Sequence, residues 1–346
     1  MRLWIHTAFG LVLVATWAGV SSVEAESAAE LSAKAVMKLP VGQPDKAPVI
    51  SGITLSPTAN LLATVGDDHL LRIWDVEHAQ VMQVMFSHAD WVRAAAFRPD
   101  GQILATAGDD HRICYWNVAS GRLALKLPDE GLPVHALAFA PNGRMLAAGG
   151  FGDQVRIYDG SDGRMLQQLD APGSDIRAVT FSPDSMHLAA AGRRGVIRIW
   201  QSATGKQVAE LPDAGRRILA LAYSPDGKLL AAGGQQRVIR LWDVATLKRS
   251  TDLPVPSGEV FSLAFCGDGS LLASGGSDNV IRLWNLCTRQ EQVRLAGHTG
   301  TVATLAFGAQ GNVLYSGGFD TTVRVWQWKD GGQGSVSQRN VSIEIK

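Results

Sequence analysis

Two sets of side chains in this chain carry the residue types of a hydrolytic triad. Each set holds a histidine, a hydroxyl and an aspartate: His298, Ser316 and Asp320 in one, His88, Thr106 and Asp110 in the other. A hydroxyl becomes a nucleophile when a histidine takes its proton and a carboxylate orients that histidine. The residue types therefore raise the question of hydrolysis, and the elements that hold them decide whether either hydroxyl is free to react.

A second group of candidate ligands lies in two short segments that contain His69 and His111. Each histidine follows a pair of aspartates, Asp67-Asp68 in one case and Asp109-Asp110 in the other. Imidazole and carboxylate groups are both metal ligands, so a metal site is one interpretation. The alternative is that exposed turn residues were copied together with the segment around them. We favour this alternative and expect neither a metal nor a cofactor.

Both groups follow from one sequence repeat of constant length, the interval from Trp284 to Trp326. Equal steps of this length back from Trp326 reach an aromatic residue each time: Trp284, Trp242, Trp200, Tyr158, Trp116 and Trp74. The same steps back from Gly318 reach a glycine each time: Gly276, Gly234, Gly192, Gly150, Gly108 and Gly66. A fixed period of this length is typical of repeat architectures, in which each unit buries its faces against its neighbours.

Each unit has the same order of elements. A small apolar segment (ALAF at 136–139) leads to a turn such as Pro-Asp-Gly, and a second segment (LLAA at 229–232) leads to the repeated glycine. A third segment ends in the repeated aromatic, and a more polar fourth follows it (LALKL at 123–127). Short runs bounded by turn residues predict four β-strands per unit. Four short strands repeated radially predict a β-propeller.

On these residues the chain resembles the WD40-repeat family over residues 35–328. Trp74-Asp75 and Trp242-Asp243 carry the signature dipeptide, and Gly297-His298 carries the other mark of the family. The resemblance implies a single closed all-β propeller of seven four-stranded blades. It also implies that the two sets above are structural tetrads completed by a tryptophan: His88, Thr106, Asp110 and Trp116, and His298, Ser316, Asp320 and Trp326. We therefore expect no catalytic residue among them.

The resemblance further implies how the ring closes. The seventh unit lacks a good fourth strand after Trp326, so Ala35–Leu39 is expected to complete it. The terminal VSIEIK at 341–346 alternates like a strand and is the alternative. The resulting organisation is a signal peptide at 1–25, a mobile leader at 26–34, the propeller at 35–330 and a flexible tail at 331–346.

The N-terminal segment 1–25 has the pattern of a signal peptide. Arg2 supplies a positive charge, Leu3–Val20 is mostly apolar, and Val23-Glu24-Ala25 offers a cleavage site. The alternative is an uncleaved anchor, although the apolar run is marginal for a span that needs about 20 residues. We expect an exported protein, periplasmic or extracellular, without stable membrane insertion after cleavage. The three cysteines (Cys114, Cys266, Cys287) are expected to be buried or half-buried thiols rather than a disulfide framework.

The charge balance bears on the kind of partner. The chain has 32 Lys plus Arg and 32 Asp plus Glu, which gives a formal net charge of zero. Binding to a polyanion such as duplex DNA depends on a basic excess that neutralises phosphates. We therefore expect no nucleic acid among the partners.

Positions that differ between the units are the candidates for function. In the family, partners usually bind the top face, which is built from the residues around the start of the innermost strand and from the turn between strands two and three. The varied residues at these positions are Trp91, Arg93, His135, Asp175, Arg177, Arg217, Glu259 and Phe261 at the strand starts, and Asp67, Asp109, Phe151, Arg193 and Phe319 in the turns. Trp, Arg and Phe dominate binding hot spots. We expect Arg177, Arg193 and Arg217 to form a basic cluster, with Asp67 and Asp109 on the opposite side beside Trp91.

The sequence thus favours an exported, non-enzymatic scaffold that binds a protein or peptide through the top face, as a monomeric propeller within a complex. One alternative is an enzyme or cofactor protein that uses the central channel. For this role only His135, Asp175 and Glu259 qualify, and they are scattered over three units. A third interpretation is a structural protein of the cell envelope.

Overall fold

The regular structure of the described residues consists of β-strands. The computed structural model describes residues 30–31, 35–38, 48–58, 60–86, 88–171, 173–212, 216–309 and 311–328. The predicted signal peptide, most of the predicted leader and the segment 341–346 lie outside these residues. Within them, no helix has the length and the apolar character needed to cross a membrane.

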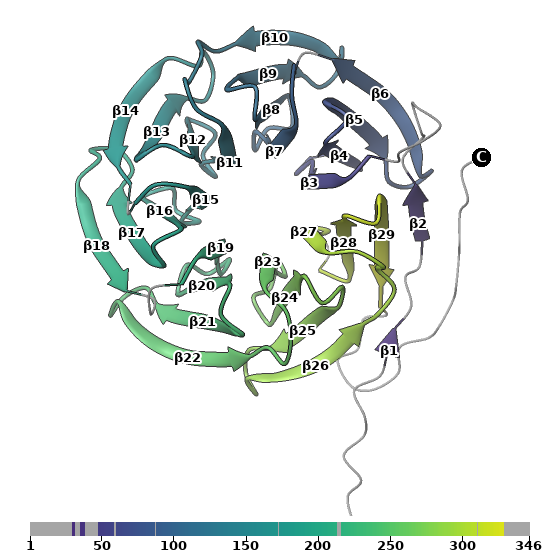
Figure 1. The fold of residues 1–346 in the computed structure, drawn as a ribbon, viewed down its shortest axis with the longest axis vertical. Helices are drawn as coiled ribbons and strands as arrows, with labels where there is room; N and C mark the ends of the chain where they lie inside the picture. The colour runs from purple at the N-terminus through teal and green to yellow at the C-terminus, as the bar shows by residue number, and fades with distance from the viewer. Residues whose placement is uncertain are drawn as a thin grey trace, which may run out of the picture.

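Seven sheets stand around a ring as the blades of a propeller (Figure 1). Blade one comprises β3 (Ile50–Leu55), β4 (Leu61–Gly66), β5 (Leu70–Asp75) and β6 (Gln80–Phe86). Blade two comprises β7 (Val92–Phe97), β8 (Ile103–Gly108), β9 (Ile113–Asn117) and β10 (Arg122–Lys126). Blade three comprises β11 (Val134–Phe139), β12 (Met145–Gly150), β13 (Gln154–Asp159) and β14 (Met165–Asp170).

The next three blades have the same arrangement. Blade four comprises β15 (Ile176–Phe181), β16 (His187–Gly192), β17 (Val196–Gln201) and β18 (Gln207–Pro212). Blade five comprises β19 (Ile218–Tyr223), β20 (Leu229–Gly234), β21 (Val238–Asp243) and β22 (Lys248–Pro254). Blade six comprises β23 (Val260–Phe265), β24 (Leu271–Gly276), β25 (Ile281–Asn285) and β26 (Gln290–Leu295). The predicted all-β, seven-bladed propeller is confirmed.

Blade seven draws its strands from both ends of the described chain. It comprises β27 (Val302–Phe307), β28 (Val313–Gly318) and β29 (Thr322–Gln327), with β2 (Ala35–Lys38) outermost. β2 runs antiparallel to β29, and Met37 lies opposite Val323. β1 (Glu30–Leu31) pairs in parallel with β26. The role of β2 in closing the ring stays a prediction.

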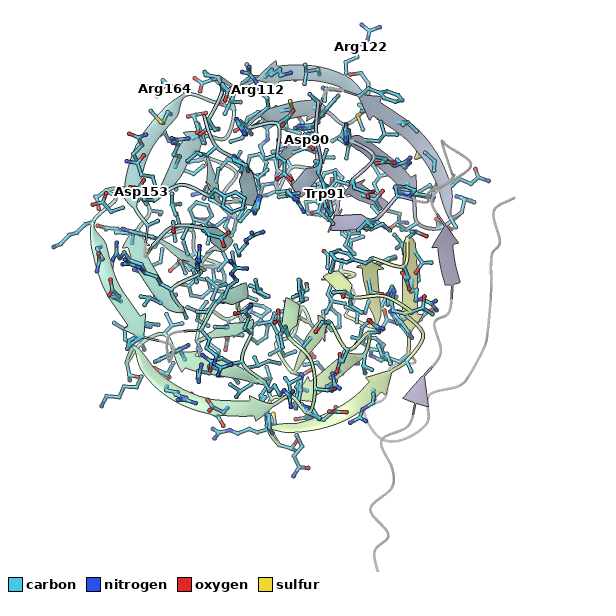
Figure 2. The ribbon with its side chains drawn as sticks, in the orientation of Figure 1. Asp90, Trp91, Arg112, Arg122, Asp153 and Arg164 are labelled. Carbon is cyan, nitrogen blue, oxygen red and sulfur yellow. The ribbon has the colours of Figure 1, made fainter. Side chains whose placement is uncertain are left out.

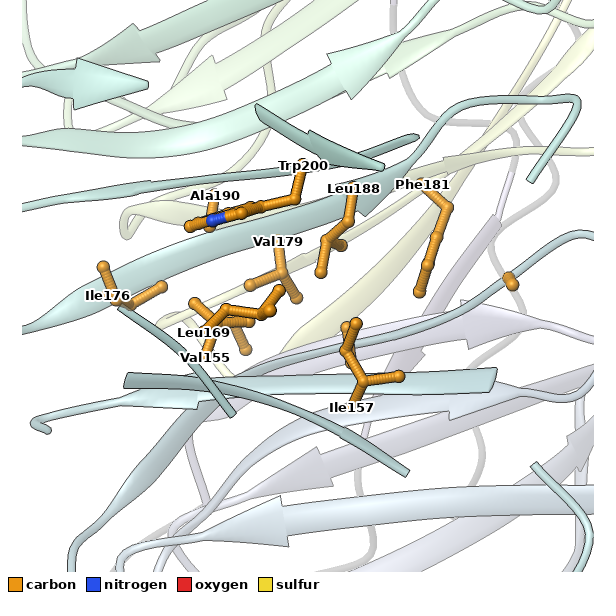
Figure 3. Packing of buried hydrophobic residues seen from close by; sticks show 12 residues of the cluster. Val155, Ile157, Leu169, Ile176, Val179, Phe181, Leu188, Ala190 and Trp200 are labelled. Carbon is orange, nitrogen blue, oxygen red and sulfur yellow. The ribbon is translucent and has the colours of Figure 1, made fainter. Parts of the chain in front are cut away.

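The hydrophobic core lies between blades rather than within them. Val155 and Ile157 of blade three pack against Val179, Leu188 and other apolar residues of blade four (Figure 3). At the seam of the ring, residues of blade seven such as Tyr315 and Val323 belong to one buried cluster with Ile50 and Trp74 of blade one. Each blade is therefore stabilised by its neighbours, as expected for stacked repeats.

The repeated glycine at the end of each second strand is explained by a close backbone contact. A Cβ atom added at Gly150 would lie 1.9 Å from the carbonyl oxygen of Pro133, and one at Gly108 would lie 2.1 Å from that of Trp91. No side chain fits at such a distance. The glycine thus lets the second strand approach the segment that enters its blade.

The cysteines differ from the prediction at one position. Cys114 and Cys266 are buried, and none of the three forms a disulfide. Cys287 is exposed, so the expectation of a buried or half-buried thiol is wrong there. Cys287 lies in the turn after β25, where the chain reverses at the surface.

Candidate functional site

The two predicted tetrads form buried hydrogen-bond networks. In blade seven, His298 Nδ1 lies 2.9 Å from Asp320, and His298 Nε2 lies 2.7 Å from Ser316 Oγ. The indole Nε1–H of Trp326 donates to the same Ser316 oxygen at 2.8 Å. Ser316 is 0% exposed, so its hydroxyl does not face a substrate. This geometry connects strands, because a buried polar network must satisfy its members internally.

Blade two has the same network around His88. His88 Nδ1 lies 3.0 Å from Asp110, His88 Nε2 lies 2.7 Å from Thr106 Oγ1, and Trp116 donates to that oxygen at 2.8 Å. Burial disfavours the charged imidazole, but the interactions of His88 with Asp110 and Cys114 together outweigh this effect and raise the pKa of His88 to about 9. The buried histidine is therefore held as a cation beside a carboxylate.

Blade three departs from the tetrad in a way that the sequence interpretation missed. Glu130 lies one repeat after His88 and so occupies the histidine position, while Ala148 and Gly152 replace the hydroxyl and the aspartate. Glu130 forms an ion pair with Arg156 of β13. The sequence does contain a signal for this replacement: the constant length of the repeat places Glu130 at the position of the histidine.

The histidines of the predicted metal alternative occupy a special turn position. His69 and His111 have φ angles of 67° and 62°, and Asn279 and Thr321 at equivalent positions have 65° and 67°. The left-handed conformation therefore belongs to the turn itself rather than to a bound ion. Among the residues that the structure describes, no three His, Cys, Asp or Glu side chains gather as a group that could hold a metal.

The predicted top-face residues of blade two form a compact unit. The Arg93 Nε–H donates to Asp109 at 2.9 Å, and His135 Nε2 of blade three lies 3.1 Å from the same carboxylate. The Arg93 guanidinium carbon lies 3.6 Å from the centre of the Trp91 ring. Partial burial opposes the charge of Asp109, but Arg93 and His135 lower the pKa of this carboxyl. Figure 2 shows Trp91 toward the inner side of the ring and Arg122 projecting from the outer rim.

Phe151 continues this unit from blade three to blade four. Its ring centre lies 4.7 Å from that of His135 in an edge-on arrangement, and the Arg177 guanidinium carbon lies 5.3 Å from the Phe151 ring centre. Burial and the charge of Arg177 lower the pKa of His135 to about 4 despite Asp109. His135 is therefore neutral at physiological pH. Phe151 remains 45% exposed.

Asp175 connects blade four to blade five. Its carboxylate accepts hydrogen bonds from Arg177 Nε and from Arg217 Nη2, both at 2.6 Å. Asp175 is 2% exposed and has a φ of 63°. The contacts described so far form one network across blades two to five: Trp91, Arg93, Asp109, His135, Phe151, Arg177, Asp175 and Arg217. Arg177 and Arg217 are adjacent, as expected, but both charges are engaged by one buried acid.

Unpaired positive charge lies beside this network. Arg193, Arg194, Arg216 and Arg237 are exposed, and none of them forms an ion pair with a residue that the structure describes. A Cβ atom at Gly195 would lie 2.2 Å from the Arg216 carbonyl oxygen, so the turn of blade four contacts the entry to blade five. We name these four residues the arginine cluster. Sequence reasoning included Arg193, and Arg217 beside Arg216, but it missed Arg216 and Arg237.

The remaining predicted residues lie outside the network. The Asp67 carboxylate accepts a hydrogen bond from the Val49 backbone N–H at 2.7 Å in blade one. Glu259 and Phe261 are half-buried at the start of blade six, and Phe319 is 41% exposed in blade seven. Within the described residues, the side-chain contacts that connect blades two to five do not extend to Glu259, Phe261 or Phe319. Three residues were candidates for a role in the central channel. Of these, His135 and Asp175 belong to the network, and Glu259 does not.

Comparison with protein-family models gives two matches that together cover most of the chain. The model described as "IFT122 first beta-propeller" matches residues 133–345, more than half of the 346 residues. The model described as "WD domain, G-beta repeat" matches residues 39–75 and 79–117. None of the curated proteins compared with the chain matches it. The resemblance noted from the sequence is confirmed, and the chain belongs to the β-propeller family described by the first of these models, with WD40 repeats.

Proposed function

We propose that this protein is an exported, non-enzymatic scaffold whose top face binds an acidic segment of a partner protein over blades three to five. WD40 propellers are typically scaffolds that bind proteins or peptides. The observation that carries the proposal is the arginine cluster, four exposed guanidinium groups without an ion-pair partner among the described residues.

The chemistry of the cluster favours a carboxylate-rich ligand. Guanidinium groups bind carboxylates through paired hydrogen bonds, and exposed guanidinium groups lose less hydration than ammonium groups on binding. The two acids of the neighbouring network, Asp109 and Asp175, are already engaged by Arg93, Arg177 and Arg217. The arginine cluster is therefore not neutralised by the acids of this network.

Phe151 supplies the apolar part of the proposed site. Its ring is 45% exposed, and the contacts of His135 and Arg177 hold it in place. A held aromatic ring beside unpaired arginines suits a segment in which one apolar side chain accompanies several acids. The partner is thus expected to be acidic with a hydrophobic anchor.

A matched pair of charge reversals tests the proposal. Arg193→Glu/Arg216→Glu alters the cluster without removing any ion pair described above, whereas Arg122→Glu/Arg164→Glu alters the outer rim (Figure 2). The probe is a fluorescent peptide rich in Asp and Glu with one Phe, followed by anisotropy. The first variant should weaken binding at least about tenfold, and the second should not. Equal binding by both variants would contradict the proposal.

Export rests on the N-terminal pattern and needs its own experiment. The full chain, with a C-terminal tag, is expressed and fractionated, and the N-terminus of the product is sequenced. The proposal predicts a product outside the cytoplasm that starts near Glu26. An intact N-terminus in the cytoplasmic fraction would contradict export, whereas an intact N-terminus in the membrane fraction would favour the uncleaved anchor.

A further inference from the structure

The outermost strand of blade one, β6, presents a row of apolar side chains to solvent. Its alternate residues Met82, Val84 and Phe86 are 58%, 41% and 72% exposed. The residues between them lie on the other face of the strand, where Met85 is buried in the cluster that joins blade one to blade two. We name Met82, Val84 and Phe86 the rim stripe, because β6 lies on the outer rim of the ring (Figure 1).

The outer strands of blades two to six carry different residues at the same positions. Val84 lies opposite Arg72 in the register of blade one, and its equivalents are polar or charged: Lys126, Gln168, Glu210, Asp252 and Arg294. The equivalents of Phe86 are Pro128, Asp170, Pro212, Pro254 and Ala296. Charged residues and proline hinder pairing at the edge of a sheet. Each of these five blades has a charge or a proline at one of the two positions, and blade one has neither.

The backbone edge of β6 is open as well. β6 pairs with β5 on one side, and on its other side it pairs with no strand that the structure describes. Blade six shows that an outer edge of this ring can accept a segment from near a chain terminus, because β1 is a fifth strand beside β26. An open edge with an apolar stripe suits an extended segment in which apolar side chains alternate with polar ones.

The last residues of the chain have this pattern. The segment 341–346, which lies outside the described residues, reads VSIEIK, so three aliphatic residues alternate with a serine, a glutamate and a lysine. In an extended strand the three aliphatic side chains share one face. Beside β6, that face would continue the rim stripe across one more strand, and cross-strand apolar pairs stabilise such an addition.

The described chain ends close to the start of β6. The Trp328 backbone N–H donates to the carbonyl oxygen of Asn312 at 3.2 Å. Asn312 and Val76 line the same hollow between blades seven and one, and Val76 opens the turn that leads to β6. Residues 329–340 can span up to roughly 40 Å when extended, whereas β6, with 7 residues, is roughly 23 Å long. The segment 341–346 can therefore reach any part of β6 in its own chain.

We propose that residues 341–346 add to the edge of β6 as a fifth strand of blade one and cover the rim stripe. Tethering gives the segment an effective concentration of about 1 mM at β6. A contact with a Kd of about 0.1 mM is then about 90% formed, whereas the same Kd leaves two chains at about 10 µM mostly apart. Tethering thus favours the chain's own terminus over a second copy. Blade one has four strands without this segment, so the contact should add little to the unfolding temperature.

Amide hydrogen exchange of the whole protein, resolved residue by residue, tests the proposal. Alternate N–H groups of the added strand point to β6, and a segment that is about 90% paired is open about one tenth of the time. These amides of 341–346 should therefore exchange about tenfold more slowly than in a synthetic peptide of residues 335–346. Exchange at the rate of the peptide would overturn the proposal. Protection that disappears when the protein is diluted about tenfold would also overturn it, because a contact between two copies depends on concentration.

Two variants and one control locate the contact. Val84→Lys places a charge in the rim stripe and should return the protected amides to the rate of the peptide. Ile343→Asp should do the same from within the segment, without any change in the blades. Val208→Lys is the control and should keep the protection, because Val208 is a similarly exposed valine on β18, the outer strand of blade four. Protection that both Val84→Lys and Val208→Lys leave intact would place the segment at another edge, such as that of β29, and would refute the proposal.

Discussion

Arg217 of blade five donates a hydrogen bond to the carboxylate of Asp175 in blade four, at 2.6 Å. The two residues are one repeat apart, so they occupy equivalent places on neighbouring blades. Arg177 donates to the other oxygen of the same carboxylate. One buried acid thus fixes two arginines across a blade boundary and engages the charge of both.

Replacement of Asp175 by asparagine should destabilise the boundary between blades four and five. Asparagine has nearly the same shape and tolerates the left-handed φ, but its amide nitrogen only donates, so the charge and one of the two hydrogen bonds from Arg177 and Arg217 are lost together. Since both arginines are partly solvated, the expected cost is about 1–3 kcal/mol in the free energy of unfolding. Urea denaturation measures it. Asp175→Ala also places alanine at a left-handed φ, so it should lower the free energy of unfolding further. Equal stability of wild type, Asp175→Asn and Asp175→Ala would show that the carboxylate does not stabilise this boundary.

Gly150→Ala should destabilise blade three because its Cβ would lie 1.9 Å from the Pro133 carbonyl oxygen. The backbone must shift to admit it, at a cost of about 1–3 kcal/mol. Gly152→Ala is the matched control two residues later, where the nearest atom lies at 3.4 Å. Thermal unfolding should separate the two variants. A Gly150→Ala protein as stable as the control would contradict the close-contact explanation of the repeated glycine.

The fold could be predicted because the repeat preserves the residues that backbone geometry restricts. The glycine at residue 150 recurs once in every unit since a Cβ atom there has no space, and such a constraint is visible in the sequence alone. The tetrad residues were likewise visible as a recurring set. What repeats in the sequence is therefore what the blade requires.

The details of the site could not be predicted in the same way. Sequence position placed Asp175 and Arg217 on one face, but it did not show that their side chains turn toward each other. The interpretation therefore counted Arg177 and Arg217 as free charge, although both bind Asp175. Glu130 was missed because its ion pair with Arg156 depends on a contact between the loop before β11 and strand β13 rather than on a motif. Charge on a face can be read from sequence, whereas its neutralisation depends on side-chain directions.

His135 should make stability fall as the pH falls from about 6.5 to 4. Burial and Arg177 lower its pKa to about 4 in the folded protein, below the value of 6.5 for an unperturbed histidine. In this window the unfolded chain binds more protons, so acid favours unfolding. Asp109 also loses stabilising charge in acid. The measurement is therefore the difference between wild type and His135→Gln, followed by urea denaturation at several pH values.

As the pH falls from about 6.5 to 4, the free energy of unfolding should decrease more for wild type than for His135→Gln. Glutamine cannot titrate and keeps a donor toward Asp109, so the comparison isolates the imidazole. Parallel pH profiles for the two proteins would show that His135 is protonated equally in the folded and unfolded states.

The N-terminal strand should contribute to the stability of blade seven, and through it to the ring. β2 pairs with β29 from Ala35 to Lys38, so its removal leaves the backbone groups of β29 without a neighbour on that side. Unpaired strand edges favour association with other chains. A mature protein that lacks residues 26–39 should therefore unfold at a lower temperature and form oligomers in light scattering. A protein that lacks residues 341–346 should resemble wild type in both measurements. The reverse pattern would assign closure of the ring to the C-terminal segment, which was the alternative indicated by its alternating sequence.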